Sequence, residues 1–278
     1  MIGQEELKTV VTRVQQMERY FDDILYALDT KPESVYEDAE ISKMLQALTE
    51  YMDGGQWLKD YACDECGELP GDLKRGVLSQ DALYNVLCDI ERKEKELNKM
   101  NALVMNCSPV RNGATAEIVH IVSECLREKY DIRSICIDDY DIQFCKGCRS
   151  CHNTAKCVQQ DDVDKIIEQY EWADIIVLVA PSYWADIPGQ FKVFIDRCTP
   201  WCNTHEPHAN ITGGKKGYSI ALRTGPSMRE CDRIIESIEH FYGHMEIECC
   251  GRLGLCSVEY KEAVEQRKSD IIEFCNKI

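Results

Sequence analysis

The stretch Asn101–Ala116 (NALVMNCSPVRNGATA) constrains the fold of this chain more than any other part of the sequence. Ala102–Cys107 is a mostly apolar run of strand length, and from Ala114 onward the apolar residues follow helical spacing. A short loop of small and polar residues joins the two. Strand, tight loop and helix in this order are typical of an α/β domain.

The loop and the first helical turn predict an anion site. The first N–H groups of a helix have no partner inside it, and they point with the positive end of the helix dipole toward the loop. Ser108 and Thr115 add hydroxyl groups, and Gly113 lets the backbone approach a ligand closely. Phosphate is the expected ligand, although the sequence also fits an ordinary strand–helix turn without one.

The rest of the chain divides into two parts. Residues 1–98 carry amphipathic helical patterns over 7–28 and 41–52, then a polar, turn-rich stretch over 55–81, then a third helix after Ser79. We expect a helical domain over 1–98 and an α/β domain over 99–278. The segment Gly55–Tyr84, with QWLKDY and GELPGDLKRGVLSQDALY, resembles a small helical domain of unknown function.

Strand-like and helical segments alternate after residue 101. The expected strands are 102–107, 132–137, 174–180, 218–222 and 246–255, and the expected helices are 115–129, 163–169, 189–197, 229–242 and 261–276. This alternation predicts a doubly wound five-stranded parallel sheet, and ligands of such sheets lie beyond the carboxyl ends of the strands.

Two more loops follow expected strands. Residues 181–188 include Tyr183 and Trp184, and exposed rings at this edge either stack on a flat heterocycle or pack against the next helix. Residues 223–227 are small enough to leave room for the edge of a ligand.

Together the loops CSPVRNGAT and APSYW and the helix QFKVFIDR resemble the flavodoxin-like NAD(P)H-dependent FMN reductase family. The resemblance implies FMN and a homodimer or larger assembly. Val110 stands where the family has arginine, so Arg111 is expected to replace it. Lys192, Asp196 and Arg197 are expected to hold structure. The implied FMN contacts are Ser108, Arg111, Gly113, Ala114, Thr115, Ala116, Pro181, Ser182, Tyr183, Trp184, Thr224 and Gly225.

Four cysteines share one short run with the spacing C-x2-C-x2-C-x5-C: Cys145, Cys148, Cys151 and Cys157. Four thiolates are the usual ligands of a [4Fe–4S] cluster, and zinc uses the same set. Free thiols or a disulfide also fit this spacing. The run is similar to that of the iron–sulfur flavoproteins, a branch of the same family, which implies the cluster. Similar runs before an acidic pair, here Asp161-Asp162, also occur in relatives without one.

Composition and charge narrow the function. The net charge of −17 argues against binding to nucleic acid or anionic membranes, which requires basic patches. Because we find no signal peptide or membrane-length apolar run, we expect a cytoplasmic protein whose 17 cysteines are reduced or bind metal. No Gly-x-Gly-x-x-Gly fingerprint is present, so NAD(P)H is expected as a transient co-substrate over the flavin.

The expected function is that of an oxidoreductase. FMN takes hydride from NAD(P)H and passes electrons to a small acceptor or, through the cluster, to a redox partner protein. This chemistry needs no acid or base from the protein, so no catalytic side chain is predicted. A second hypothesis is an electron carrier without its own substrate, whose acidic surface docks a basic partner. A third is an interaction protein that has lost its ligand.

Overall fold

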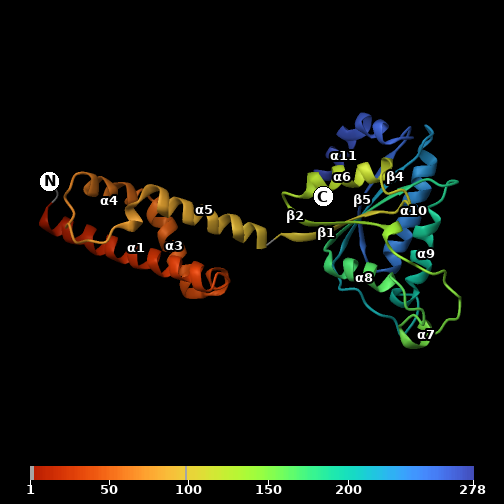
Figure 1. Cartoon of the computed structure of the whole chain (residues 1–278), viewed down its shortest axis with the longest axis horizontal. Helices are drawn as coiled ribbons and strands as arrows, with labels where there is room; N and C mark the ends of the chain where they lie inside the picture. The colour runs from red at the N-terminus through yellow and green to blue at the C-terminus, as the bar shows by residue number, and fades with distance from the viewer. Residues whose placement is uncertain (1–2, 98) are drawn as a thin grey trace. The chain divides into compact units, whose positions relative to one another are not determined.

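The computed structural model describes residues 3–97 and 99–278 and separates into two compact units, Met1–Asn98 and Lys99–Ile278 (Figure 1). Each unit has its own hydrophobic core. In the part of the chain that is described, no helix is both long and apolar enough to cross a membrane.

The first unit consists of helices. They are α1 (Gln4–Thr30), α2 (Ser34–Glu37), α3 (Ala39–Asp53), α4 (Gln56–Glu65), the 3-10 turn η1 (Gly76–Leu78) and α5 (Gln80–Leu97). The apolar stripes expected on α1 and α3 are buried, with Val14 and Ile24 from α1 packed in one core with Leu48 from α3. Burial of these stripes, more than intrinsic helix propensity, holds such a helical unit together.

The prediction that residues 55–81 form a turn-rich stretch was wrong in part, because Gln56–Glu65 forms helix α4. Gly55 has φ +70° and precedes the helix in a left-handed conformation. Trp57 is 3% exposed, and its Nε1 donates a hydrogen bond of 2.9 Å to the carbonyl of Val77. Asp60 is fully buried. The helix was missed because its buried face carries a carboxylate, which sequence patterns assign to the surface.

Asp60 joins three helices. Arg13 of α1 donates from Nη2 to Oδ1 of Asp60 (2.6 Å) and from Nε to Oδ2 (2.8 Å), and the hydroxyl of Tyr51 on α3 donates to Oδ2 (2.9 Å). Burial and the hydrogen bond to Asp60 raise the pKa of Tyr51 well above its usual value. A buried carboxylate persists only when it is paired in this way.

We expect Asp60→Asn to lower the free energy of unfolding of the helical unit by about 3 kcal/mol, because Arg13 keeps its charge and loses its partner. Hydrogen exchange of the amides in α1 and α4 measures this loss. The matched control is Asp89→Asn, whose ion pair with Arg92 is mostly exposed (63% and 68%) and is worth less than about 1 kcal/mol. If the amides of α1 and α4 were equally protected from exchange in both variants, Asp60 would not stabilise the helical unit as described.

The second unit is built on a five-stranded sheet in the order β2-β1-β3-β4-β5, with all neighbouring strands parallel. The strands are β1 (Met100–Asn106), β2 (Tyr130–Cys136), β3 (Ile175–Pro181), β4 (Lys216–Leu222) and β5 (Glu248–Leu255). The predicted doubly wound, flavodoxin-like sheet is confirmed.

Helices lie between successive strands and after the last one. They are α6 (Ala114–Leu126), α7 (Cys151–Thr154), α8 (Val163–Trp172), α9 (Gly189–Arg197), α10 (Met228–His244) and α11 (Lys268–Cys275). Short 3-10 segments are η2 (Ile137–Asp139), η3 (Thr199–Trp201) and η4 (Lys261–Arg267). The last expected helix is therefore in two parts, since its first turns are 3-10 and only residues from Lys268 form an α-helix.

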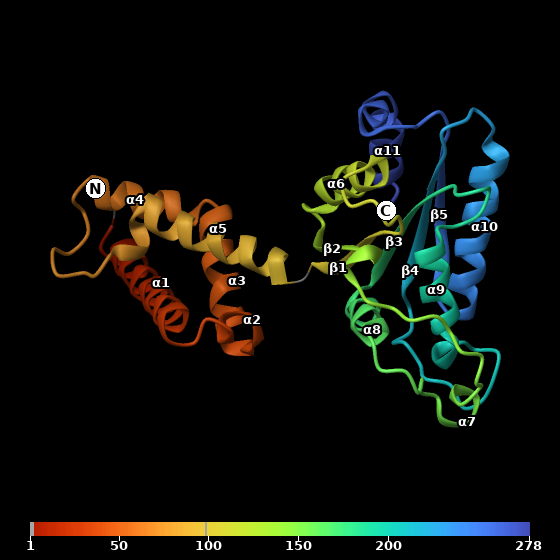
Figure 2. The same ribbon diagram turned by 45° about the vertical axis from the view of Figure 1, so that its right-hand side comes forward.

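Helices cover both faces of the sheet, with α6 and α11 on one side and α8, α9 and α10 on the other (Figure 2). Alternate residues of β1 point to opposite faces, so Val104 packs in the core with α6, and Leu103 and Met105 pack in the core with α8. Coverage of both faces explains why the central strands β1 and β3 are buried over most of their length.

The strand order determines where the loops lie. The chain goes from β1 through α6 to β2, and then through α8 on the opposite face to β3. The order therefore reverses between β1 and β3, which is where ligands bind in doubly wound sheets. Because β1, β3 and β4 are parallel neighbours, the loops that follow them lie at one edge.

Candidate functional site

The loop after β1 is held by its own side chains. Oδ1 of Asn106 accepts from the amide of Ser108 (2.9 Å), and Nδ2 of Asn106 donates to the carbonyl of Val110 (3.1 Å). Oγ of Ser108 accepts from the amide of Val110 (3.1 Å). The sequence analysis missed Asn106, although a polar residue ending an apolar strand is a detectable signal. The loop is thus shaped before any ligand arrives.

Helix α6 begins directly behind this loop, and within the described residues no side chain caps its amino terminus. A Cβ at Gly113 would lie 2.9 Å from Cγ1 of Val110, so glycine permits the close turn. Ser108 and Thr115 are 2% and 4% exposed. The first amides of α6 therefore face the loop with two hydroxyls nearby, which is an arrangement that can bind an anion.

Arg111 is engaged by acidic residues after β2. Its Nε lies 3.0 Å from Oδ2 of Asp138, its Nη2 donates to the carbonyl of Asp138 (2.7 Å), and its Nη1 lies 2.7 Å from Oδ1 of Asp139. The positive charge that the sequence analysis assigned to a phosphate is therefore shared with two carboxylates.

The loop after β3 makes a tight turn that presents Trp184 to solvent. The amide of Tyr183 donates to the carbonyl of Asp186 (2.9 Å), and the amide of Asp186 donates back (3.2 Å). Trp184 and Ala185 have φ +55° and +61°, a left-handed conformation that costs roughly 1–2 kcal/mol per residue without glycine. Trp184 is fully exposed. Such conformations cluster at functional sites.

The loops after β3 and β4 are joined by hydrogen bonds. The amide of Ser182 donates to the carbonyl of Leu222 (2.8 Å), and its hydroxyl donates to Oε2 of Glu230 (3.0 Å). Nη1 of Arg223 lies 2.9 Å from Oε1 of Glu230. Gly225 leaves room for Arg223, because a Cβ there would lie 2.3 Å from its Nη2. Sequence reasoning missed the Arg223–Glu230 pair, whose residues are seven positions apart.

The predicted residues fall into two groups. Ser108–Ala116, Pro181–Trp184 and Thr224-Gly225 follow the three adjacent strands β1, β3 and β4 at one edge of the sheet. The four-cysteine segment, Cys145–Cys157, instead belongs to the long connection between β2 and α8.

The structure brings all four cysteines of that segment to one small cavity of about 30 Å³. The chain turns there through left-handed residues at Gly147 (φ +62°), Arg149 (+57°) and Ala155 (+54°). All four side chains are free thiols. Among residues 3–97 and 99–278, no three His, Cys, Asp or Glu side chains are gathered closely enough to hold a metal ion.

The thiols in this cavity differ in acidity. Hydrogen bonds from the backbone and side chain of Ser150 lower the pKa of Cys148. Burial raises the pKa of Cys151, and the nearby Cys157 and Cys148 act in the same direction. Cys148 is therefore the more readily ionised of the two, which favours it as a metal ligand or nucleophile.

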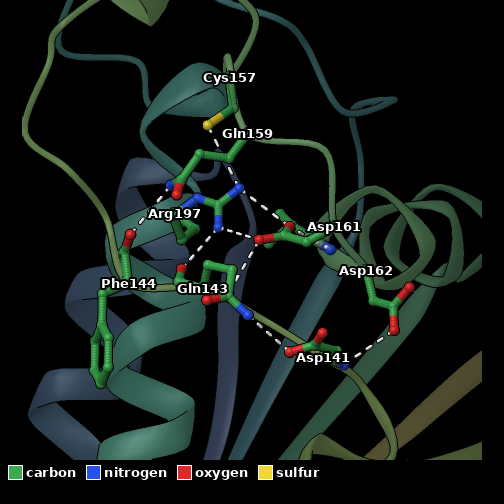
Figure 3. A network of polar contacts seen from close by, with 9 residues as sticks. Asp141, Gln143, Phe144, Cys157, Gln159, Asp161, Asp162 and Arg197 are labelled. Atoms are coloured by element: carbon green, nitrogen blue, oxygen red, sulfur yellow. Dashed lines mark hydrogen bonds and ion pairs between the residues drawn. The ribbon is translucent and has the colours of Figure 1, made fainter.

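Arg197 of α9 holds both ends of the four-cysteine segment (Figure 3). Its side chain is 1% exposed and forms an ion pair with Asp161, whose side chain is 6% exposed. Nη1 donates to the carbonyl of Gln143 (2.7 Å), and Nη2 donates to Oδ1 of Asp161 (3.1 Å) and to Sγ of Cys157 (3.4 Å). The segment is thus fixed before Cys145 and at Cys157.

Comparisons with known proteins agree with this geometry. Residues 100–251 match the family model described as NADPH-dependent FMN reductase, and residues 14–100 match a domain of unknown function. The chain belongs to the NADPH-dependent FMN reductase family. The resemblances to this family and to the helical domain of unknown function are therefore confirmed.

Several curated relatives carry the name iron-sulfur flavoprotein. One from Archaeoglobus fulgidus is 30% identical over 127 residues, which cover 45% of this chain and 56% of the relative. The one from Methanosarcina thermophila is 31% identical over 91 residues, which cover 32% and 48%. The chain thus spans about half the length of these relatives.

The crystal structure of Smu.1420 from Streptococcus mutans shares the fold, with a TM-score of 0.51 and 19% identity. The alignment covers 64% of this chain and 100% of that one.

The Arg197–Asp161 pair predicts a specific dependence of stability on pH. Burial acts to raise the pKa of Asp161, but hydrogen bonds from Arg197 and from the amides of Gln143 and Val163 outweigh it, so this pKa is lowered. A lowered folded-state pKa contributes stability above the unfolded value of about 3.9, and that stability is lost as pH falls through the folded value.

We therefore expect Asp161→Asn to cost about 3 kcal/mol of unfolding free energy near neutral pH, since it leaves a buried guanidinium unpaired. The difference between wild type and variant should shrink as the pH falls below about 4, because the unfolded wild-type chain then binds a proton at Asp161, and it should vanish once the folded carboxyl is protonated as well. Urea unfolding at a series of pH values measures it. The exposed Asp232→Asn is the control, and a pH-independent difference for Asp161→Asn would refute the account.

Proposed function

We propose that this chain is an FMN-dependent oxidoreductase that takes hydride from NAD(P)H. The observation that carries the proposal is the convergence of three loops at the carboxyl ends of β1, β3 and β4, with an anion cradle in the first, in a member of the FMN reductase family. The relatives named iron-sulfur flavoprotein support a flavin as the ligand.

The phosphate of FMN would be held mainly by the backbone. The amides of Ala114, Thr115 and Ala116 are the first of α6, and Gly113 allows close approach. The Ser108 and Thr115 hydroxyls add side-chain contacts. Arg111 adds positive charge, which Asp138 and Asp139 partly neutralise. A cradle of backbone amides fits a phosphate without an arginine at position 110.

The flavin ring would lie between the loops after β3 and β4. Pro181, Ser182 and Tyr183 line one side, Thr224 and Gly225 supply small groups on the other, and the exposed indole of Trp184 is free to stack on a ring. When bound, FMN accepts a hydride and releases electrons singly or in pairs. The side chains need only bind and orient the ring, so the proposal assigns no acid or base.

We assign a [4Fe–4S] cluster to Cys145, Cys148, Cys151 and Cys157. The donor set fits, because four free thiols line one cavity, and Arg197 already donates a hydrogen bond to one of them. A cluster held by these residues would supply one-electron transfer to a small acceptor or a redox protein. To hold a cluster, the four sulfur atoms would have to come closer together than they lie among the residues that this structure describes.

We expect Thr115→Val to weaken FMN binding about 10- to 100-fold, because it removes one hydrogen bond to a charged phosphate and keeps the side-chain volume. Quenching of FMN fluorescence measures the affinity. The control is Thr212→Val. Thr212 lies before the amino end of β4, away from the loops at the carboxyl ends of the strands, and its hydroxyl donates to Glu171 (2.8 Å).

The same titration tests the function as a whole. A wild-type protein that binds no FMN would contradict the proposal, whereas equal affinity of Thr115→Val would contradict only the position of the phosphate. NAD(P)H oxidation by the FMN-loaded protein supports an enzyme. Bound FMN without such turnover would favour an electron carrier.

We expect roughly four irons and matching acid-labile sulfide per chain after anaerobic purification, and loss of both in Cys148→Ser and Cys151→Ser. FMN binding should persist in these variants, because the cysteine segment does not supply the FMN loops. Cys249→Ser is the control, since Cys249 is an exposed cysteine outside the segment. One zinc per chain, or no metal, would contradict the cluster.

A further inference from the structure

We propose that His240 and His244 of α10 form a binding site for a divalent transition-metal ion, separate from the FMN loops and from the four-cysteine segment. The two residues are one helical turn apart and project from the same face. Their Nε2 atoms lie 3.1 Å from each other, and the ring centroids are 4.4 Å apart at 88°.

The distance between the two nitrogens suits one shared ion. Metal–nitrogen bonds to histidine are about 2.0–2.1 Å, so two imidazoles on one ion have nitrogens about 2.9 Å apart at a right angle and about 3.3 Å apart in a tetrahedral site. The observed 3.1 Å lies between these values. In the absence of an ion, a hydrogen bond joins the two nitrogens across this distance, and a bound ion would take the place of its proton.

Asn203 determines which nitrogen of His244 carries the proton. The backbone N–H of Asn203 donates to the carbonyl of His244 (3.0 Å), and the side-chain Nδ2 of Asn203 donates to the carbonyl of Gly243 (3.2 Å). Its Oδ1 therefore faces Nδ1 of His244, at 3.4 Å. Because this oxygen only accepts, Nδ1 holds the proton and Nε2 presents its lone pair toward His240. Metal-binding histidines are commonly oriented in this way.

The surroundings leave the remaining coordination positions open. Both histidines line a groove of about 620 Å³ between α9 and α10, and Cys202 and Glu236 line the same groove. No third donor is gathered with them among the described residues. The site therefore has two protein ligands, with water in the other positions. Imidazole pairs suit zinc, nickel and copper, and not magnesium or calcium.

Nickel is the probe, because the thiols of the four-cysteine segment prefer softer metals. Equilibrium dialysis of the full chain should show one more bound Ni²⁺ per chain in the wild type than in His240→Ala or His244→Ala. His120 is an exposed histidine on α6, and the control variant His120→Ala should bind as much Ni²⁺ per chain as the wild type. Asn203→Ala should weaken binding about 10-fold, because an outer-shell partner of a metal ligand contributes at least that much.

A second readout needs no variant. In the wild-type protein, paramagnetic Ni²⁺ should broaden the NMR signals of the His240 and His244 rings at lower concentrations than those of His120. The proposal would be overturned if both histidine variants bound as much Ni²⁺ as the wild type, or if the signals of His240, His244 and His120 broadened at the same Ni²⁺ concentration. The contact would then be only a hydrogen bond between two imidazoles.

Discussion

Burial of both faces of the parallel sheet is the constraint on which the rest of this structure depends. Parallel strands require crossover connections, and the helices that form them must cover both faces. Here α6 covers one face and α8 the other, so the strand order reverses between β1 and β3. The loop after β1 and the loop that carries Trp184 follow these two strands, so the two loops are neighbours although about 70 residues separate them in the sequence.

A second constraint is the buried charge of Arg197. A guanidinium that is 1% exposed must be paired, and Asp161, Gln143 and Cys157 supply its partners. The segment between β2 and α8 is mostly exposed and contains little regular structure. Arg197 therefore helps to hold its two ends together, along with hydrogen bonds from the amide of Gln143 to Asp161 and from Gln159 to the carbonyl of Phe144. The same physics operates in the helical unit, where Asp60 is buried and Arg13 and Tyr51 satisfy it. In both units a paired charge replaces part of the apolar core.

Four of the six non-glycine residues with positive φ in the described part of the second unit lie where chemistry is proposed, and the other two are Glu246 and Ser257. Trp184 and Ala185 are left-handed at the edge of the sheet, and Arg149 and Ala155 are left-handed within the four-cysteine segment. Both places are loops on a rigid scaffold, which is the usual arrangement for binding residues. The His240–His244 pair differs, because it lies on a regular helix and its spacing follows from helical geometry alone.

The sequence by itself determined the α/β architecture, the family and the strand–loop–helix at Asn101–Ala116, because apolar periodicity and loop composition are local properties. Only the tertiary structure showed which residues that are distant in the sequence contact each other. Helix α4 depends on Asp60 finding Arg13, which is 47 positions away. The contacts of Arg111 with Asp138 and Asp139 likewise depend on which side chains the fold brings together. Pairing of buried charges is a long-range property, so no window of sequence contains it.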